Sequence, residues 1–512
     1  MWLEVFLLLS IAIYLFYLWA TVNNDFFVKR GIAYKKPVVM FGNMWELVLR
    51  RKSIIDIVVD LYSEHDGQVY GIFDQRQPVL LIRDPELLKQ ITVKDFDHFV
   101  NHRTVFGDEN DKNNLFGASL FMMKDSRWKD MRSTLSPAFT GSKMRQMFQL
   151  MNKVANDATA YLKQQQKESA SQGLEIDVKN FVTRYSNDII ASTAFGLEVN
   201  SFENNNNEFY LMGKKVTTFT FIQNLKFFLY VHIGKLMRLL GIGLFDTKST
   251  EYFMHLVLDA MKYRKENNII RPDMINMLME ARGMLKSDNL KSHNREWSDI
   301  DIVGQCFLFF FAGFETVASL ICLLAHEVME NADVQEKLLQ EIQDADRNLD
   351  GKPITYDIIM KMNYLDMVVS ETLRKWSVAA VVDRVCTDDI TYELKNGQKL
   401  EIRKGDCIWI PVAGFHRDPQ YYENPTKFDP ERFSEENKDN IRPFTYLPFG
   451  LGPRNCIGSR FALLETKVLI YYLLRDFHFA AAKNSSIPLK LDSNGFQLMP
   501  KKGFWLKFIS RN

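Results

Sequence analysis

The stretch FGLGPRNCIG, from Phe449 to Gly458, decides the fold. It places Cys456 in a turn rich in glycine and proline, directly before an apolar-periodic run from Ser459 to Leu474 that predicts a helix. A cysteine at a helix N-terminus has its thiolate favoured by the helix dipole and by free backbone N–H groups, and Arg454 adds a positive charge. The turn is therefore suited to hold a sulfur anion.

Three other uses of this cysteine fit the sequence poorly. A zinc site needs further ligands at short spacing, whereas the nearest cysteine is Cys407 and the nearest histidine is His478. A hydrolytic cysteine–histidine pair finds none of the nine histidines in a recognisable motif. A dinucleotide-binding loop needs a third glycine at a fixed offset after Gly450 and Gly452, which is missing. What is left is one thiolate on a metal that brings its other ligands, for which haem iron is the natural candidate.

Upstream, the apolar segment from Ile302 to Ala325 contains a single charge, Glu315, and is long enough to span a membrane. A charge near its centre would cost about 2.5 to 3.5 kcal/mol on insertion scales. The helical pattern also continues into the charged residues that follow, and Ser298 with Asp301 forms an S-x-x-D start signal. We therefore predict a buried central helix of about thirty residues.

Inside this helix, the sequence Ala312-Gly313-Phe314-Glu315-Thr316 sets an acid beside an alcohol, after two small residues that permit close approach to the backbone. The alternative is a structural one, in which the threonine bonds to a carbonyl four residues earlier and the glutamate meets a buried cation. A second pair, Glu371 and Arg374, shares a helix face, but such pairs contribute little when exposed and say little alone.

The N-terminus predicts a membrane anchor. Val5 to Val22 is an uncharged stretch that spans about 27 Å as a helix, which equals the apolar thickness of an endoplasmic-reticulum bilayer. A cleaved signal peptide is the competing interpretation, but the run is too long, lacks a basic region before it and has no small-x-small site after it. Basic residues dominate between Lys29 and Lys52, so the body is expected in the cytosol.

Composition supports one large cytosolic body. With 46% apolar and 25% charged residues, the 512-residue chain matches ordinary globular proteins. A net charge of +1 gives no field for a polyanion, so nucleic acid is not an expected partner, and five cysteines are no disulfide framework. We expect an anchor at 1–22, a basic, proline-containing connector at 23–45 and a single catalytic domain at 46–512.

Small sheets should punctuate this helical protein. Val69–Phe73 and Val79–Ile82 predict one hairpin, and Ile390–Leu394 with Lys399–Ile402 predicts a second around Asn396-Gly397, followed by a strand at Cys407–Ile410. At the C-terminus we expect strands at Ile487–Leu491, Phe496–Met499 and Phe504–Phe508. The fold class is mainly α with small β-sheets.

Taken together, the chain resembles a microsomal cytochrome P450, a haem-thiolate monooxygenase, along its whole length. The cysteine loop matches F-x-x-G-x-R-x-C-x-G at every position. Three further motifs precede it in family order: A-G-x-[ED]-T at 312–316, E-x-x-R at 371–374 and P-E-R-F at 430–433. The sequence is most similar to insect enzymes that handle plant toxins and pesticides. The resemblance implies a triangular, helix-rich prism behind the transmembrane anchor.

The resemblance also implies roles for individual residues. Cys456 becomes the axial ligand of haem b (iron protoporphyrin IX), with Phe449 in the same cofactor-binding loop, while Thr316 and Glu315 organise the protons that O2 activation needs. A buried ion-pair cluster of Glu371, Arg374 and Arg432 would hold the cysteine loop. The propionate contacts are expected from Trp128, Arg132, Arg384 and Arg454, with His102 or Arg103 as a further contact.

The substrate pocket is expected to be apolar and to take lipophilic molecules. On the central helix, a three- and four-residue spacing groups Leu308, Phe311, Ala312, Thr316 and Ser319 on one face. Family topology adds the loop near Phe106, residues Leu115 to Phe121, then Ala379, Ala380, Val381 and Val382, and the hairpin tip at Phe496. One departure touches this pocket, since no proline pair follows the E-x-x-R motif at Lys375-Trp376-Ser377-Val378.

Partners and location follow from the same resemblance. Electrons derived from NADPH would come from a separate NADPH–cytochrome P450 reductase, with cytochrome b5 as a further donor, because the chain has no flavin or nicotinamide motif. Lys124, Arg127 and Lys129 form the expected basic docking face, or else a plain solvated face. The protein would be single-pass in the endoplasmic-reticulum membrane. Residues 219–245 would dip into its lipid or form a buried core helix.

Three other functions stay open at this stage. The enzyme could oxidise an endogenous lipid or hormone instead of a foreign compound. It could be a haem-thiolate isomerase or dehydratase that needs no reductase, although the intact Glu315-Thr316 pair argues against this. A non-enzymatic membrane-anchored haem or lipophile-binding protein is the third alternative.

Overall fold

A computed structural model of the chain describes residues 1–104, 114–169, 172–218, 220–271, 273–285, 297–493 and 498–511. The helices of the N-terminal half are α1 (Trp2–Thr21), α2 (Phe26–Lys29), α3 (Trp45–Val48), α4 (Ile54–Ser63), α5 (Pro85–Lys89), α6 (Asp125–Leu135), α7 (Gly141–Glu168), α8 (Val178–Ile190), α9 (Glu208–Thr217), α10 (Phe221–Leu239), α11 (Thr247–Asn267) and α12 (Met274–Ala281). The C-terminal half adds α13 (Asp299–Glu330), α14 (Ala332–Leu349), α15 (Tyr356–Lys361), α16 (Asn363–Trp376), α17 (Val412–His416) and α18 (Ser459–Asp476).

The strands are β1 (Val69–Asp74), β2 (Gln77–Ile82), β3 (Leu174–Asp177), β4 (Val382–Val385), β5 (Ile390–Glu393), β6 (Lys399–Ile402), β7 (Cys407–Ile410), β8 (Phe477–Ala481) and β9 (Trp505–Ser510). Single-turn π or 3-10 segments are η1 (Gln90–Lys94), η2 (Phe96–His98), η3 (Ser136–Phe139), η4 (Ala191–Phe195), η5 (Pro430–Phe433), η6 (Lys438–Asn440) and η7 (Gly452–Arg454). The prediction of a mainly helical protein with small sheets is confirmed.

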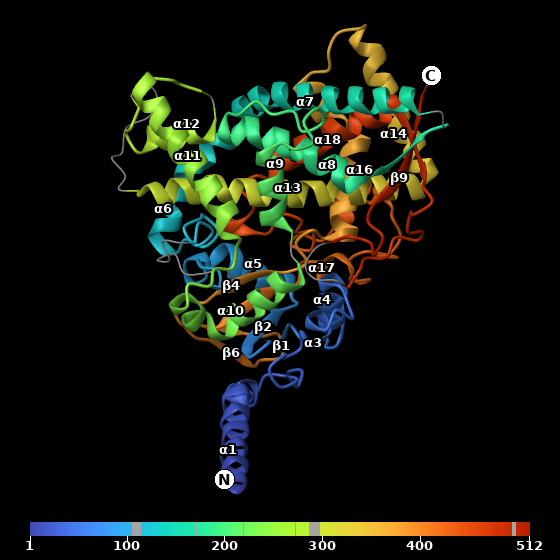
Figure 1. Cartoon of the computed structure of the whole chain (residues 1–512). Helices are drawn as coiled ribbons and strands as arrows, with labels where there is room; N and C mark the ends of the chain where they lie inside the picture. The colour runs from blue at the N-terminus through green and yellow to red at the C-terminus, as the bar shows by residue number, and fades with distance from the viewer. Residues whose placement is uncertain are drawn as a thin grey trace.

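Helix α13 is the central element. It crosses the whole body in Figure 1, with α7, α8, α9, α14, α16 and α18 gathered on one side and the sheet-rich part on the other. Its start is the predicted one, since Ser298 and Asp301 form a reciprocal capping box. Among the described residues, α1 and α13 are both long and apolar enough to cross a membrane, but most of α13 is buried in the protein. The prediction of a core helix is therefore confirmed.

The sheets lie mainly on the anchor side of the body (Figure 1). The predicted hairpins are present as β1–β2 and β5–β6, both antiparallel. Strand β7 lies between the first hairpin and β4, because it pairs in parallel with β2 and antiparallel with β4. This order, β1-β2-β7-β4, sets β4 beside the cysteine loop, where it carries Arg384.

The C-terminal sheet differs from the prediction. Strand β9 is present and pairs with β3 and β8, in the order β3-β9-β8. The expected strand at 487–491 is reduced to an isolated bridge between Leu491 and Pro500. The chain does turn back between these two residues, but a continuous strand pairing was predicted and is wrong. Residues 494–497 of the expected hairpin tip, Phe496 among them, lie outside the described residues.

Helix α1 projects from the body with its apolar side chains exposed (Figure 1). Its last turn is held by a cation–π contact, in which the Arg76 guanidinium lies 3.7 Å from the Trp19 ring centroid. Helix α10 lies close by, and its His232 meets the same ring edge-on at 6.1 Å. Because α10 exposes Ile222, Leu225 and Leu236, it is a surface helix, which excludes the buried-core alternative for this segment.

Candidate active site

The cysteine loop is a closed turn that fixes the position of Cys456. The backbone N–H of Cys456 donates to the Phe449 carbonyl at 2.8 Å. Gly450 and Gly452 both have positive φ angles, +75° and +67°, which strain any residue with a side chain. At Gly452 a Cβ would also lie 1.9 Å from the carbonyl oxygen of Thr92 in η1, so the loop presses directly on that segment. Glycine at both positions thus has a conformational cause, and at Gly452 also a steric one.

Cys456 is the exposed member of five free cysteines. Burial of the thiol among protein atoms nevertheless raises its pKa. A hydrogen bond from the Gly458 backbone and the charge of Arg132 oppose that rise. The exposed surface therefore faces space within the protein and not bulk water. Arg132 thus supplies a positive charge beside the thiol in addition to Arg454, which the sequence named for that role.

Arg132 of α6 is fixed on the cysteine loop. Its Nη1 donates to the Asn455 carbonyl and its Nη2 to Asn455 Oδ1, both at 2.8 Å. Trp128, one turn earlier on α6, is buried and receives the Arg454 guanidinium on its ring at 4.2 Å. The two residues share one face of α6, as predicted, and that face is turned to the cysteine loop.

Arg454 is a buried bracket between the cysteine loop and two other segments. Its Nε donates to Val100 O at 2.7 Å, its Nη1 to Leu120 O at 3.1 Å and its Nη2 to Met123 O at 2.6 Å. Burial lowers the pKa of this guanidinium to about 9. These hydrogen bonds give Arg454 a framework role, and they leave one N–H of Nη2 for the predicted contact to the cofactor.

Arg384 is a fully buried cation that lacks an anionic partner. Its Nη1 donates to the Asp383 carbonyl at 2.6 Å and its Nη2 lies 3.4 Å from Leu451 O, whereas its Nε has no partner. Burial lowers its pKa to about 10. In the described parts of the chain, no carboxylate lies within ion-pair distance of this guanidinium. An unpaired buried cation is costly, so an anion is expected beside it.

The neighbouring carboxylate, Asp383, is committed elsewhere. Its Oδ1 lies 3.0 Å from His102 Nδ1 and its Oδ2 accepts from the Arg103 backbone N–H at 2.7 Å. Burial alone would raise the pKa of Asp383, but His102 and Arg103 hold it below its usual range. His102, Arg384 and Arg454 therefore surround one site from three segments of the chain.

On α13, the A-G-x-E-T motif borders open space. Ala312 and Thr316 are exposed although the helix turns before and after them are buried. The Thr316 hydroxyl donates to the Ala312 carbonyl at 2.6 Å, which is the back-bond that the structural alternative predicted. That bond uses the hydroxyl proton and leaves the oxygen lone pairs free on the open face.

Glu315 meets a cation, as the same alternative predicted. Lys179 Nζ of α8 lies 2.7 Å from Glu315 Oε1 and 3.0 Å from Ser319 Oγ. Ser319 is only 4% exposed, so it belongs to this polar cluster and does not share the open face with Thr316. The predicted grouping of Ser319 with the pocket is therefore wrong, because a spacing of three from Thr316 and four from Glu315 fits either side of the helix.

Three of the remaining pocket residues form a run of aromatic contacts that starts on α13, next to Ala312. Phe311 meets the Phe116 ring at 5.4 Å, Phe116 meets Phe121 at 6.0 Å, and Phe121 stacks on His102 at 4.6 Å. Phe121 is exposed. Leu308 and Val381 are half-buried, Ala379 is exposed and Ala380 is buried, with its carbonyl accepting from the Ala413 N–H. Phe106 and Phe496 lie outside the described residues.

The E-x-x-R pair forms the predicted ion-pair cluster. Arg374 donates from Nε and Nη2 to the two oxygens of Glu371, both at 2.7 Å, and neither side chain is exposed. Arg374 Nη1 also donates to the carbonyls of His416 and Pro425, and Arg432 Nε lies 3.5 Å from Glu371 Oε1. The cluster thus ties α16 to the segment before the P-E-R-F element and to the element itself.

His416 links this cluster to the approach of the cysteine loop. Its Nε2 accepts from the Leu447 backbone N–H at 2.7 Å, and its Nδ1 lies 2.9 Å from Ser377 Oγ. Burial and the charge of Arg374 lower the pKa of His416 to about 3, so the ring is neutral. Ser377 belongs to the loop after the E-x-x-R motif that lacks the proline pair. Its hydrogen bond to His416 fixes this loop in the absence of the prolines.

Sequence reasoning missed Lys179, Asp383 and Gln305. Lys179 and Asp383 are brought to the site by distant segments of the chain. The sequence predicted a cation beside Glu315 but could not identify it as Lys179, and it gave no signal for Asp383. Gln305 has a detectable signal, since it is a lone amide in the apolar part of the central helix. Of the expected basic face, Arg127 pairs with Asp301 and Lys129 with Asp97, so two of its three charges are neutralised.

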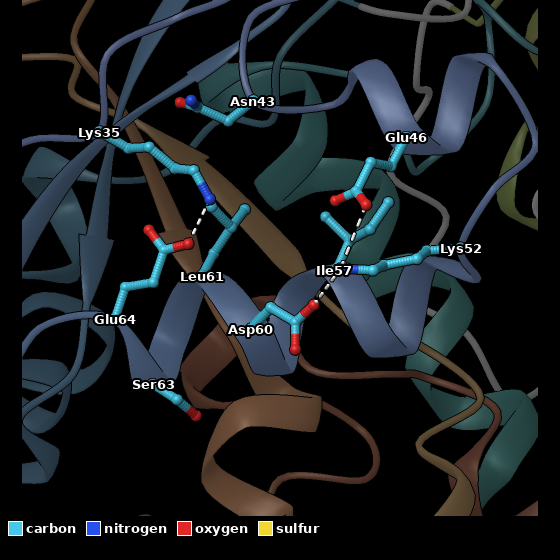
Figure 2. A pocket seen from close by; sticks show the side chains of 9 residues that line it. All are labelled: Lys35, Asn43, Glu46, Lys52, Ile57, Asp60, Leu61, Ser63 and Glu64. Carbon is cyan, nitrogen blue, oxygen red and sulfur yellow. Dashed lines mark hydrogen bonds and ion pairs between the residues drawn. The ribbon is translucent and has the colours of Figure 1, made fainter.

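A separate surface pocket of about 320 Å³ lies near the anchor side. Figure 2 shows its charged side chains turned to one another, with Lys35 paired to Glu64 and Lys52 to both Glu46 and Asp60. Since these charges neutralise each other, the pocket offers no unsatisfied group to a ligand and is not a second candidate site.

Comparison with known proteins agrees with this geometry. The family profile described as "Cytochrome P450" matches residues 33–508. Two similar insect proteins are "Probable cytochrome P450 9f2" of Drosophila melanogaster, 62% identical over 99% of both chains, and "Cytochrome P450 9e2" of Blattella germanica, 44% identical over 100% of this chain and 98% of the other. "Cytochrome P450 3A11" of Mus musculus is 36% identical over 100% and 97%. The chain belongs to the cytochrome P450 family.

A cytochrome P450 is a monooxygenase, an oxidoreductase that uses a haem, O2 and electrons from a redox partner to act on small molecules. The residues of this chain fit that haem. A buried cation without a carboxylate partner, Arg384, is suited to a propionate, and Cys456 is a thiol with accessible surface. The exposed Ala312 and Thr316 leave room along α13.

Proposed function

We propose that Cys456 is the thiolate ligand of a haem b and that the open face of α13 at Ala312 and Thr316 borders its other side. The observation that carries this proposal is the buried Arg384, whose Nε has no partner and which has no carboxylate of its own. Trp128 and Arg132 on α6 contact the cysteine loop, through Arg454 and Asn455 respectively, and would line the same haem site. Arg384 would bind one propionate, and His102 would contribute a further contact.

The haem, when bound, supplies the activation of O2 and the transfer of one oxygen atom to substrate carbon. The chain's own residues position the proton supply. Thr316 keeps its oxygen lone pairs towards the open face because its proton is donated to Ala312 O. Glu315 lies beside it and is connected through Lys179 to the half-exposed start of α8. We assign proton delivery to this pair.

The substrates are proposed to be lipophilic foreign compounds such as plant toxins or insecticides. Phe116, Phe121 and Phe311 present aromatic rings over the open face, which suits apolar and aromatic molecules. The alternative, an endogenous lipid or hormone, uses the same surface. A panel of both substrate types would distinguish them by the ratio of kcat/KM values.

We further propose a single-pass anchor in the endoplasmic-reticulum membrane, with residues 46–512 as one catalytic domain on the cytosolic side. Helix α1 is apolar and exposed, and α10 exposes apolar side chains next to the end of the anchor (Figure 1). Both features favour contact with lipid. An NADPH–cytochrome P450 reductase, assisted by cytochrome b5, is the proposed electron donor, since the chain carries no flavin motif.

The test is the spectrum of the purified holoprotein, reduced and saturated with carbon monoxide. A thiolate ligand gives the red-shifted Soret band of a cytochrome P450, and Cys456→His should abolish that band. The control is Cys407→Ala, which changes a buried cysteine in β7 and should leave the band in place. A wild-type protein that binds haem without the shifted band would overturn the assignment, and so would NADPH oxidation independent of added reductase.

A further inference from the structure

Gln305 of α13 holds a pocket loop by its backbone. This side chain is fully buried, and its Oε1 accepts from the Leu120 N–H at 2.7 Å. Its Nε2 donates to Ala118 O at 2.9 Å and, within the helix, to Asp301 O at 2.8 Å. Every hydrogen-bonding group of the amide that points to the loop is therefore used on main chain and not on side chain.

The Leu120 peptide connects α13 to the cysteine loop. Its N–H is bound by Gln305, and its C=O accepts from Arg454 Nη1 at 3.1 Å. Arg454 lies two residues before Cys456. One residue of the loop is thus fixed by α13 and by the cysteine loop at once, and both bonds are buried, where a lost partner is costly.

Close packing beside Gln305 makes this attachment rigid. A Cβ on Gly304 would lie 2.8 Å from the Leu115 carbonyl and 3.0 Å from the Ala118 Cβ, so loop and helix touch without a side chain between them. The buried Ser119 adds a local turn, with its hydroxyl donating to Phe116 O at 2.6 Å. The loop between 114 and 123 therefore has little freedom while Gln305 binds it.

The same loop carries two rings of the pocket. Phe116 contacts Phe311 on α13, and Phe121 stacks on His102. Phe121 follows Leu120 directly, so a shift of the Leu120 peptide moves its ring over the open face.

We propose that Gln305 is a positioning residue that determines which ligand shapes the pocket accepts, by fixing the Leu120 peptide and thereby the Phe116 and Phe121 rings. This inference rests on the proposed function for its effect on ligands, but the attachment itself does not. Gln305 is fully buried with its amide bound to main chain, so its effect on ligands would pass through the loop.

The chain contains a matched control. Gln335 of α14 is equally buried and binds the backbone of another residue in the same way, with Oε1 accepting from Phe479 N–H at 2.7 Å and Nε2 donating to Phe479 O at 3.1 Å. Gln335→Met therefore removes the same chemistry from strand β8, away from the pocket. Gln305→Met is the test. Gln305→Glu is a partial rescue, since a neutral carboxyl at this buried position keeps the acceptor for the Leu120 N–H and can donate one of the two hydrogen bonds to the carbonyls of Ala118 and Asp301.

The first measurement is hydrogen–deuterium exchange of the full chain as holoprotein. Gln305→Met should speed exchange of the 114–123 amides by about tenfold or more, Gln305→Glu should restore part of the protection, and Gln335→Met should speed exchange only around Phe479. Unchanged exchange at 114–123 in folded Gln305→Met would overturn the proposal. Should Gln305→Met not fold while Gln335→Met does, Gln305→Asn carries the same comparison, because its amide is one methylene too short to reach the Leu120 peptide, and wild-type protection of 114–123 in that variant would equally overturn the proposal.

The second measurement separates pocket shape from cofactor binding. Imidazole and 4-phenylimidazole are titrated spectrally as probes, because only the latter reaches beyond the iron towards the loop. Gln305→Met should change the ratio of their Kd values by about threefold or more, with the imidazole Kd and the carbon-monoxide spectrum unchanged. An unchanged ratio would overturn the specificity role. Absence of the thiolate spectrum in the wild type would instead refute the proposed function and leave the exchange result standing.

Discussion

Lys179 Nζ of α8 lies 2.7 Å from Glu315 Oε1 of α13, so the acid of the A-G-x-E-T motif is held by a cation from another helix. Both side chains are partly exposed, at 16% and 20%, which places the pair between solvent and the interior of the central helix. The same ammonium donates to Ser319. The pair therefore forms a polar connection to Thr316 from outside the apolar core.

Lys179→Met should reduce the product formed per NADPH consumed by about two- to tenfold, because Glu315 loses the partner that fixes its position. Stability should change by less than about 1 kcal/mol, since the pair is partly hydrated. Product and NADPH are measured together in the reconstituted system. Ser319→Ala is the control: it removes the other Lys179 acceptor and keeps the ion pair, so its coupling should match the wild type.

Thr316→Ala should uncouple NADPH oxidation from product by about tenfold, because the open face of α13 loses its only hydroxyl at this turn. Thr316→Ser keeps the oxygen and should retain coupling. The matched control is Thr159→Ala in α7, which loses an equivalent back-bond, from Thr159 Oγ1 to Ala155 O at 3.0 Å, outside the site. If Thr316→Ala stays coupled, the residue does not take part in proton delivery.

Local signals in the sequence predicted the elements that depend on neighbours in the chain. The capping box at Ser298, the hairpin at Asn396-Gly397 and the helix after Cys456 all form as expected, because their determinants lie within a few residues. Pairings between distant segments carry no such signal. The parallel register of β2 with β7, Val79 opposite Cys407, comes from burial of both strands and has no local mark.

The site shows the same division. Cys456, Thr316 and the Glu371–Arg374 pair could be named from motifs, whereas Lys179 and Asp383 reach the site only through tertiary packing. Periodicity also misplaced Ser319, since helix spacing gives a face only to within about one residue. For Arg454, the charge was visible in the sequence, whereas its bonds to three distant backbone segments were not.

Breaking the buried Glu371–Arg374 pair should be far more damaging than breaking an exposed pair of the same spacing. Arg374→Ala strands Glu371 without its bidentate partner and should cost about 3–5 kcal/mol, which leaves little folded holoprotein. Arg347 and Asp344 provide the comparison, as an exposed pair also three residues apart. Arg347→Ala should change stability by less than about 0.5 kcal/mol. Denaturation of purified protein and haem content per chain measure both effects.

Glu465, in the core between α18 and α8, should make the protein less stable as the pH rises. The carboxyl is fully buried, accepts from Ser186 Oγ at 2.7 Å and has one unpartnered oxygen. Burial raises its pKa to about 8, so the folded chain keeps a proton there that the unfolded chain, with a pKa near 4.5, has lost. Stability from this group is complete below about pH 4.5 and falls until about pH 8.

Comparison with Glu465→Gln between pH 6.5 and 8 isolates this effect, because other groups contribute alike to both proteins; His416, whose pKa burial lowers from 6.5 to about 3, is one of them. Across those 1.5 pH units the wild type should lose about 2 kcal/mol of unfolding free energy to Glu465. Glu465→Gln keeps the acceptor for Ser186 but cannot ionise, so its denaturant midpoint should be flatter across the window and higher than the wild type at pH 8. Parallel curves for the two proteins would mean that Glu465 is ionised in the folded state at neutral pH.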